Sequence, residues 1–434
     1  EVVVTGTMRE RYLRDTPVKV EVVPGARLRH GVATSNLMDV IGRINGLDRQ
    51  LDCGVCYTDN IRINGVEGAN TAVLVDGMPL MGALASVYGL NGISPMIIDR
   101  VEVVKGPQST LYGTHALGGV VNVLTKDPQL TPTFSADVFA KSTREASVDL
   151  AAAPKFGRWS GFVSGTLFHM DRFIDDNGDG FADMPWMTRA SLFGKGALAG
   201  PEGGRRLDVA AKVYAEDRAG GVAGFSHDLR GSDAVYGESI YTRRAELTAD
   251  YRPAGTDERM RLSGALAAHD QDSYYGTEHY DARQRIVFGQ ATWEQPLSAT
   301  RHLLAGATLR YETYDDNTPA TDAGPDRRFI PGVFVQGEAD LGAGVDVLGG
   351  LRFDRHGEHG LITAPRLSAK ISPSERTTWR LNGGTGFRVV HVFTEDHAAL
   401  TGSREVVFAE DLAPERSYSL TASLQHIVPF GANP

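Results

Sequence analysis

The pattern of hydrophobic and polar residues changes near residue 130. Before that point, short β-branched runs bounded by Gly, Pro and Asn occupy residues 2–4, 18–23, 72–75, 101–104 and 120–124. Such runs are typical of buried strands in a small mixed sheet. Residues 35–44 have helical spacing, with Ser35 as a possible N-cap and Gly46 beyond the end. The first part of the chain is therefore predicted to be a compact α+β unit.

After Pro132 the pattern alternates with a period of two residues. In residues 303–312 the odd-numbered positions are apolar, and the even-numbered positions from Gly306 onward are glycine or polar. Residues 345–354 and 417–425 repeat this alternation. It predicts about fourteen strands of barrel-like length. Alternation alone does not separate a membrane barrel from a soluble β-sandwich, because both have one apolar and one polar face.

The connections favour the barrel. Short turns at residues 201–204 and 342–344 alternate with long polar loops near 171–187, 216–240, 314–329 and 389–414. Short turns on one rim and long loops on the other are the arrangement of outer-membrane barrels. The mean hydropathy of -0.21 is compatible with this fold, because only alternate residues would face lipid. The net charge of -10 argues against a general nucleic-acid binder.

Specific motifs sharpen this interpretation. The run DRVEVVKGPQSTLYG at residues 99–113, continuing without a gap as THALGGVVNVLTK to residue 126, resembles the plug signature of TonB-dependent outer-membrane receptors. Residues 61–65 and 74–80 resemble other plug segments, and residues 386–388 and 412–417 resemble two barrel motifs. The resemblance implies an α+β plug domain at residues 8–130 and an antiparallel transmembrane β-barrel at 131–434. Large plugged transporters have about 22 strands, so we expect about 14 of them here and a C-terminally incomplete chain.

The resemblance also implies a function. It predicts TonB-dependent active uptake of a scarce ligand (a siderophore, haem, cobalamin or another metal complex) across the bacterial outer membrane. The implied partners are TonB with ExbB and ExbD, the small metal-complex ligand and outer-membrane lipid. A signalling or adhesion barrel of the same fold, which binds a ligand without moving it, is the alternative. An enzyme is disfavoured, because no paired His ligands or nucleophile–base motif accompanies the DNGDG loop at residues 176–180.

The start of the chain resembles the TonB box of this family, a short extended segment that can join the sheet edge of another protein. The residues of this segment are Glu1, Val2, Val3, Val4, Thr5, Gly6 and Thr7. A frayed terminal strand, or a sheet edge within the plug, is the alternative interpretation.

By the same resemblance, two apical plug loops contribute to the ligand site. Their candidate contacts are Tyr57, Met78, Met81 and Tyr88, each of which could equally serve packing. Plug arginines of the family meet barrel glutamates, so Arg62, Arg100 and Glu415 are candidates for a lock between the two domains. Ordinary surface salt bridges are the alternative for these three residues.

Two segments have ligand chemistry of their own. Asp175, Asn177 and Asp179 stand at alternate positions, Gly180 permits a turn and Asp183 follows, which suits a structural Ca²⁺ ion or a solvated acidic turn. Cys53 and Cys56 supply two ligands, too few for a structural zinc site. They predict a short disulfide, with a redox pair and a soft-metal half-site as alternatives.

Overall fold

The computed structural model describes residues 3–4, 6–9, 11–29, 37–42, 44–53, 58–79, 82, 84, 90–171, 173–200, 205–256, 259–390 and 412–428. None of the helices in this part of the chain is long and apolar enough to span a bilayer.

The N-terminal unit, which we call the plug, is built on a four-stranded mixed sheet. Its strands are β3 (Val20–Pro24), β7 (Ile98–Lys105), β8 (Gly119–Thr125) and β6 (Thr71–Val75), in that spatial order. β6 and β8 are parallel, whereas the other two pairs are antiparallel. β4 (Leu47–Cys53) pairs with β5 (Thr58–Ile63), and β1 (Val3–Val4) with β2 (Arg11–Tyr12). The predicted β-branched strands of the plug are confirmed.

Short helices connect these strands. They are α1 (Gly25–Arg29), α2 (Leu37–Ile41), α4 (Ser109–Tyr112), η1 (Gly68–Asn70), η2 (Leu90–Gly92) and η3 (Pro95–Ile97). The predicted helix at residues 35–44 is confirmed for α2, and the chain turns after Ile41; residues 35, 36 and 43 lie outside the described residues. Gly46 has a φ of 72° in that turn, a conformation that glycine adopts without strain.

The plug core continues into the large sheet formed by residues 134–426, which we call the wall. Val101, Val103 and Val121 are fully buried in one cluster that also contains Phe162 and Phe193 of the long strands. Plug and wall therefore share apolar packing rather than meeting only through polar side chains.

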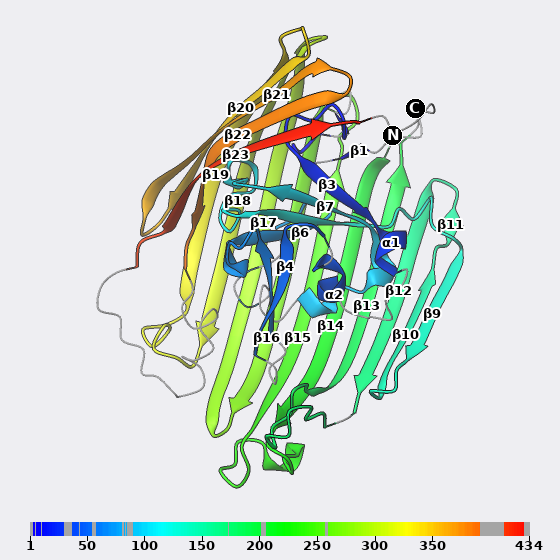
Figure 1. Cartoon of the computed structure of the whole chain (residues 1–434), viewed down its shortest axis with the longest axis vertical. Helices are drawn as coiled ribbons and strands as arrows, with labels where there is room; N and C mark the ends of the chain where they lie inside the picture. Colours follow the sequence, from blue (N-terminus) through cyan, green and yellow to red (C-terminus); the bar gives the residue numbers. More distant parts are fainter. Residues whose placement is uncertain are drawn as a thin grey trace.

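The rest of the chain forms one large antiparallel sheet. Of its fifteen strands, β11 (Lys155–Phe156) pairs off the main path with β12, and the other fourteen follow one another in chain order. They are β9 (Phe134–Ala140), β10 (Glu145–Ala152), β12 (Trp159–Met170), β13 (Trp186–Ala199), β14 (Arg205–Gly221), β15 (Gly237–Tyr251), β16 (Met260–Tyr275), β17 (Glu278–Ser298), β18 (Arg301–Asp316), β19 (Asp326–Asp340), β20 (Val345–His356), β21 (Gly360–Ser374), β22 (Thr377–Arg388) and β23 (Glu415–His426). The long strands curve around the plug, whose elements lie on the concave side (Figure 1).

The orientation of the two strand faces separates a membrane barrel from a soluble sandwich. In β18, Leu309 and Tyr311 are 55% and 41% exposed, whereas Thr308, Arg310 and Glu312 are buried. A soluble sandwich buries its apolar face, but here the polar face is the buried one. The outward apolar face is what a barrel presents to lipid.

Several long connections lie at one end of the sheet, as predicted, although that end also holds the short turns at residues 276–277 and 357–359. Residues 171–185, 222–236 (with the short helix η4, His227–Leu229) and 317–325 form long connections at one end. The predicted loop at 216–240 is wrong in its bounds, because β14 continues to Gly221 and β15 begins at Gly237. Strand pairing at Gly221 and Gly237 holds these flanks in the sheet.

Candidate functional site: contacts between plug and wall

Arginines on the inner face of the wall hold the plug by its backbone. They donate to plug carbonyl oxygens, Arg310 Nη1 to Pro79 (3.1 Å), Arg352 Nη1 to Leu111 (3.3 Å) and Arg380 Nε to Thr16 (3.3 Å). The guanidinium has five N–H donors in a planar fork, so one arginine can bind a carbonyl and a carboxylate together. Arg352 does so, since its Nε and Nη2 also pair with Asp354 at 2.6 and 2.7 Å.

An ion pair between the buried Lys195 and the partly exposed Asp76 joins the plug turn at residues 76–77 to β13. Lys195 Nζ lies 3.0 Å from Asp76 Oδ2 and donates to Thr125 Oγ1 at 2.8 Å. Asp76 also accepts from the backbone N and the hydroxyl of Thr125, at 2.8 and 2.6 Å. Burial alone would raise the pKa of Asp76, but Lys195 and the Thr125 hydrogen bonds outweigh it and lower this pKa. Asp76 is therefore charged at neutral pH, and Lys195 compensates that charge.

A second group of charges clasps the N-terminal segment to the wall. Arg9 lies 2.7 Å from both Glu294 and Glu338, and Arg11 lies 2.7 Å from the same Glu338 oxygen. His302 Nδ1 is 3.0 Å from Arg9 Nη2. We call this group the N-terminal clasp. It fixes the stretch between β1 and β3 against β17, β18 and β19.

The plug also approaches β22 very closely. A Cβ on Gly386 would lie 2.7 Å from the Cα of Leu117, so only glycine fits there. Next to it, the backbone N of His115 donates to the Phe387 carbonyl oxygen at 3.2 Å. Burial and then the Arg310 charge lower the pKa of His115 to about 4, which leaves the imidazole neutral at pH 7. A cavity of about 50 Å³, bordered by His115 and Arg310, remains at this contact.

The predicted lock between plug and barrel involves other residues. Arg100 pairs with Glu102 and Asp99 of its own strand, at 2.9 and 3.0 Å. Glu415 pairs with Arg388 of the neighbouring barrel strand at 2.9 Å. The Nε of Arg62 has no hydrogen-bond partner in the described part of the chain. Pairing Arg62 or Arg100 with Glu415 was therefore wrong, although pairs of the expected kind exist at Arg9 and Arg11.

Of the four predicted ligand contacts, the structure describes only Met78. Met78 is 5% exposed and packs against Ala265, Ala267, Ile286 and Phe288 of the wall, so its side chain serves packing. Tyr57, Met81 and Tyr88 lie outside the described residues, as do Cys56 and the side chain of Cys53.

The TonB-box-like segment is described only in part. Val3 and Val4 form β1, and their backbone pairs with Arg11 and Tyr12. Thr7 is buried, and its carbonyl oxygen accepts from Gln336 Nε2 at 3.2 Å. Gly6 is also buried, whereas Glu1, Val2 and Thr5 lie outside the described residues.

In the acidic loop after β12, the carboxylates hold the backbone in turns. Asp175 accepts from the backbone N of Gly178 (2.7 Å) and of Gly180 (2.9 Å) through its two oxygens. Asp179 and Asp183 accept from the backbone N of Phe181 (2.8 Å) and Asp176 (2.6 Å), and Asn177 Oδ1 accepts from the Asp179 N (2.9 Å). Oxygens of Asp175, Asp179 and Asp183 do not converge within 4.8 Å of one another.

Polar atoms on the inner face of β15, β16 and β17 form a group that the sequence did not single out. Both ring nitrogens of His269, the Gln271 and Gln284 Oε1 atoms and the Thr242 hydroxyl are buried without a hydrogen-bond partner in the described part of the chain. A buried polar atom without a partner costs about 1–3 kcal/mol, so these positions favour a bound polar group. Inward-facing polar residues in alternation were the only signal in the sequence.

These features define a class of protein, a β-barrel whose polar inner face holds an N-terminal plug. The family comparison agrees. Residues 12–120 match the model of the TonB-dependent receptor plug domain, and residues 157–432 match that of the TonB-dependent receptor-like β-barrel. The chain belongs to the TonB-dependent receptor family, a family of receptors and transporters rather than of enzymes, and is an outer-membrane β-barrel protein.

Among curated relatives, the vitamin B12 transporter BtuB of Vibrio vulnificus (strain CMCP6) is 24% identical over 437 residues, which cover 96% of this chain and 67% of the relative. The ferric enterobactin receptor PirA of Pseudomonas aeruginosa is 24% identical over 464 residues, with 90% and 61% covered. The chain thus spans about two thirds of their length.

Solved structures share the fold. The siderophore receptor PirA from Pseudomonas aeruginosa superposes with a TM-score of 0.68 at 18% identity, covering 94% of this chain and 72% of the other. The FrpB iron transporter from Neisseria meningitidis (F3-3 variant) gives a TM-score of 0.72 at 13% identity, covering 94% and 70%.

Proposed function

We propose that this protein takes part in TonB-dependent uptake of a scarce metal complex across the outer membrane, a transport role rather than a catalytic one. The N-terminal clasp is the observation that carries the proposal. Arg9 and Arg11 lie in the chain between the TonB-box-like residues 1–7 and the plug sheet, and both pair with Glu338 of the wall. A pull on the N-terminus by TonB, energised through ExbB and ExbD, would reach this clasp before the rest of the plug.

The contacts explain why the plug would stay closed without such a pull. Breaking a buried ion pair leaves an uncompensated charge and costs about 3–5 kcal/mol. Glu338 and Lys195 are both buried, and each compensates a charge of the other domain. Several such contacts broken one after another need external work, which an energised partner supplies.

For the ligand we propose a metal complex such as a ferric siderophore, haem or cobalamin. Relatives of this chain carry the names of a vitamin B12 transporter and a ferric enterobactin receptor. The partnerless atoms of His269, Gln271 and Gln284 are the wall positions that we propose a ligand contacts during passage. Hydrogen bonds to an incoming polar ligand would remove their desolvation cost.

For the acidic loop we propose a structural Ca²⁺ ion, bound by Asp175, Asn177, Asp179 and Asp183. Alternating oxygen donors and the turns at Gly178 and Gly180 (φ of 77° and 82°) support it. Calorimetric titration of Ca²⁺ into the protein and its Asp179→Ala variant tests the site. Heat of binding in the first and not the second is expected, and equal heats would contradict the proposal.

Uptake of radiolabelled ferric enterobactin and cobalamin, measured in cells carrying the full-length gene with and without TonB, tests the function. Val4→Pro removes the backbone N–H that a partner strand needs, whereas Val4→Ala keeps it. We expect Val4→Ala to retain uptake and Val4→Pro to lower it to the level of cells without TonB. Uptake that ignores TonB would instead favour a passive or purely ligand-binding barrel.

A further inference from the structure

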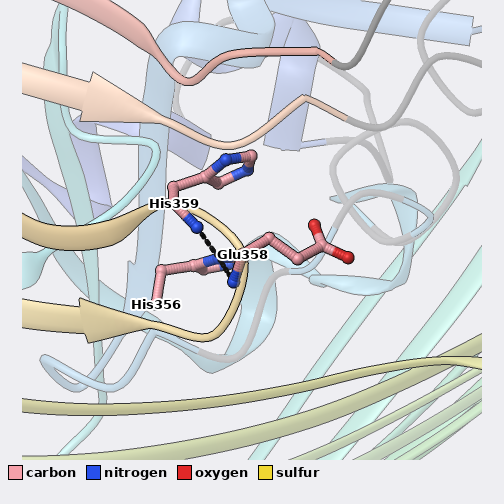
Figure 2. Close-up of side chains that lie close together, drawn as sticks. All are labelled: His356, Glu358 and His359. Atoms are coloured by element: carbon pink, nitrogen blue, oxygen red, sulfur yellow. Dashed lines mark hydrogen bonds between the residues drawn. The ribbon is translucent and has the colours of Figure 1, made fainter.

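A cluster of metal-ligating side chains lies in the turn between β20 and β21, away from every contact described above. One nitrogen each of His356 and His359 and one carboxylate oxygen of Glu358 lie within 4.8 Å of one another. Figure 2 shows the two imidazole rings one above the other, with Glu358 extending to the side from the same turn. Within the described residues, no other group of three or more His, Cys, Asp or Glu side chains converges in this way.

The turn holds the two rings in place. Their centroids are 4.5 Å apart, with an interplanar angle of 19°. The backbone N atoms of Glu358 and His359 lie 3.3 and 3.4 Å from the Nδ1 of His356, so the turn wraps around that ring. The ligand set is therefore partly preorganised.

His356 also has an unused nitrogen. His356 is only 3% exposed, and its Nε2 has no hydrogen-bond partner in the described part of the chain. Leaving such an atom buried costs about 1–3 kcal/mol. A metal on Nε2 would shift the ring proton to Nδ1 and displace the two backbone contacts. These are longer than the usual distance of about 3.0 Å and are therefore weak enough to yield.

The distances require only small adjustments. With metal–ligand bonds of about 2.1 Å, ligand atoms of a tetrahedral site lie about 3.4 Å apart. Each atom here is within 4.8 Å of the others, so rotations that shorten each separation by at most about 1.4 Å close the site. Glu358 is exposed and is free to make that rotation.

The donor set selects the class of ion. Two imidazoles with one carboxylate suit Zn²⁺ and neighbouring divalent transition metals, whereas Ca²⁺ takes oxygen ligands. Three protein ligands leave a fourth position for water or for a donor atom of another molecule. The cluster is thus chemically distinct from the acidic loop of Asp175.

The position of the turn gives the site access to the exterior. Successive strands of the sheet are antiparallel, so the β20–β21 turn lies at the same end as the long connections after β12, β14 and β18. In outer-membrane barrels the long loops are extracellular.

We propose that His356, Glu358 and His359 bind a divalent transition-metal ion, with Zn²⁺ as the best fit, at the extracellular mouth of the barrel. The proposal does not depend on which ligand is transported or on TonB. The ion is bound directly by the chain, in the short turn that joins β20 to β21.

Zn²⁺ titration by calorimetry of the folded full-length protein in detergent, free of any histidine tag, is the test. We expect one Zn²⁺ per site and a Kd at least tenfold higher for His359→Ala, with a smaller increase for Glu358→Gln. His279→Ala is the matched control. His279 is at the same end and stacks on Tyr274, but it lies beside a single carboxylate, Asp272, at 3.1 Å. Its substitution should leave the Kd unchanged.

Cobalt absorption provides a second measurement that a general change in folding does not imitate. Co²⁺ bound by two imidazoles and a carboxylate in four-coordinate geometry gives intense visible bands, which should be lost in His359→Ala. The strand signal in circular dichroism should stay the same in both turn variants, because residues 357–359 lie outside the sheet ladder. Failure of the protein to bind Zn²⁺, or equal Kd values for it and both turn variants, would overturn the proposal and show the ring pair to be turn packing only.

Discussion

The ion pair between Lys195 of the wall and Asp76 of the plug offers a direct measure of how the plug is held. Lys195→Met keeps the length of the side chain but removes its charge. The variant leaves Asp76 charged, with only the two Thr125 hydrogen bonds as compensation. The substitution also removes the hydrogen bond that Lys195 donates to the Thr125 hydroxyl.

The structure sets the size of the effect. Removing one partner of a fully buried pair costs about 3–5 kcal/mol. The Lys195 side chain is 6% exposed, but that of Asp76 is 27% exposed, so water can partly replace the lost partner. We therefore expect about 2 kcal/mol, which corresponds to roughly a 30-fold rise in the opening equilibrium of this part of the plug.

Native-state hydrogen exchange measures that opening at the Thr125 amide, which donates to Asp76. Lys141→Met is the control, because Lys141 pairs with Glu145 at an exposed turn of the wall. It should change Thr125 exchange less than twofold, in line with the small contribution of exposed pairs, about 0–1 kcal/mol. Comparable exchange rates in the two variants would refute the idea that this pair holds the plug. In the Asp76→Asn background, the effect of Lys195→Met should fall by at least half.

Three further perturbations test other contacts. Glu338→Gln should release the N-terminal clasp and speed tryptic cleavage after Arg9 at least fivefold, as followed by mass spectrometry, whereas unchanged cleavage would contradict the clasp. Gly386→Ala forces a Cβ to 2.7 Å from Leu117 and should lower the free energy of unfolding by about 1–3 kcal/mol in urea titrations, whereas Gly383→Ala, whose Cβ would meet only ordinary contacts, should be nearly neutral. Because the pKa of His115 is lowered to about 4, the unfolded state binds more protons, and stability should fall as pH drops from about 6.5 to 4. In His115→Gln that loss of the urea midpoint should be smaller, and an identical pH profile would exclude His115 as its source.

Short segments of the sequence predicted much of the architecture. The alternation in residues 303–312 predicted β18 and both of its faces, because a strand turns successive side chains to opposite sides. The β-branched runs likewise predicted β6, β7 and β8, and the plug motif identified the family. The helix predicted at residues 35–44 ends earlier, at Ile41, since helical spacing does not by itself say where packing ends the helix.

The contacts that hold the plug were decided only by the tertiary structure. Lys195 and Asp76 are 119 positions apart, and Arg9 and Glu338 are 329 apart. The sequence could show that the wall has inward-facing charges and that the plug has arginines, but not which of them meet. It therefore offered Arg100 and Glu415 as lock candidates, although each pairs within its own domain, and it left Met78 open between ligand contact and the packing that the wall provides.

The physical reason is that strand faces depend on residues close together in the sequence, whereas plug–wall pairs depend on residues far apart in it. Strand faces follow from a two-residue period within one segment, so the sequence by itself determined the elements, their faces and the family. Pairings between plug and wall depend on how one domain is rotated and seated inside the other. If the plug were shifted by one residue inside the wall, the inward arginines from Arg310 to Arg380 would meet different partners. Only the folded chain fixes the position of the plug.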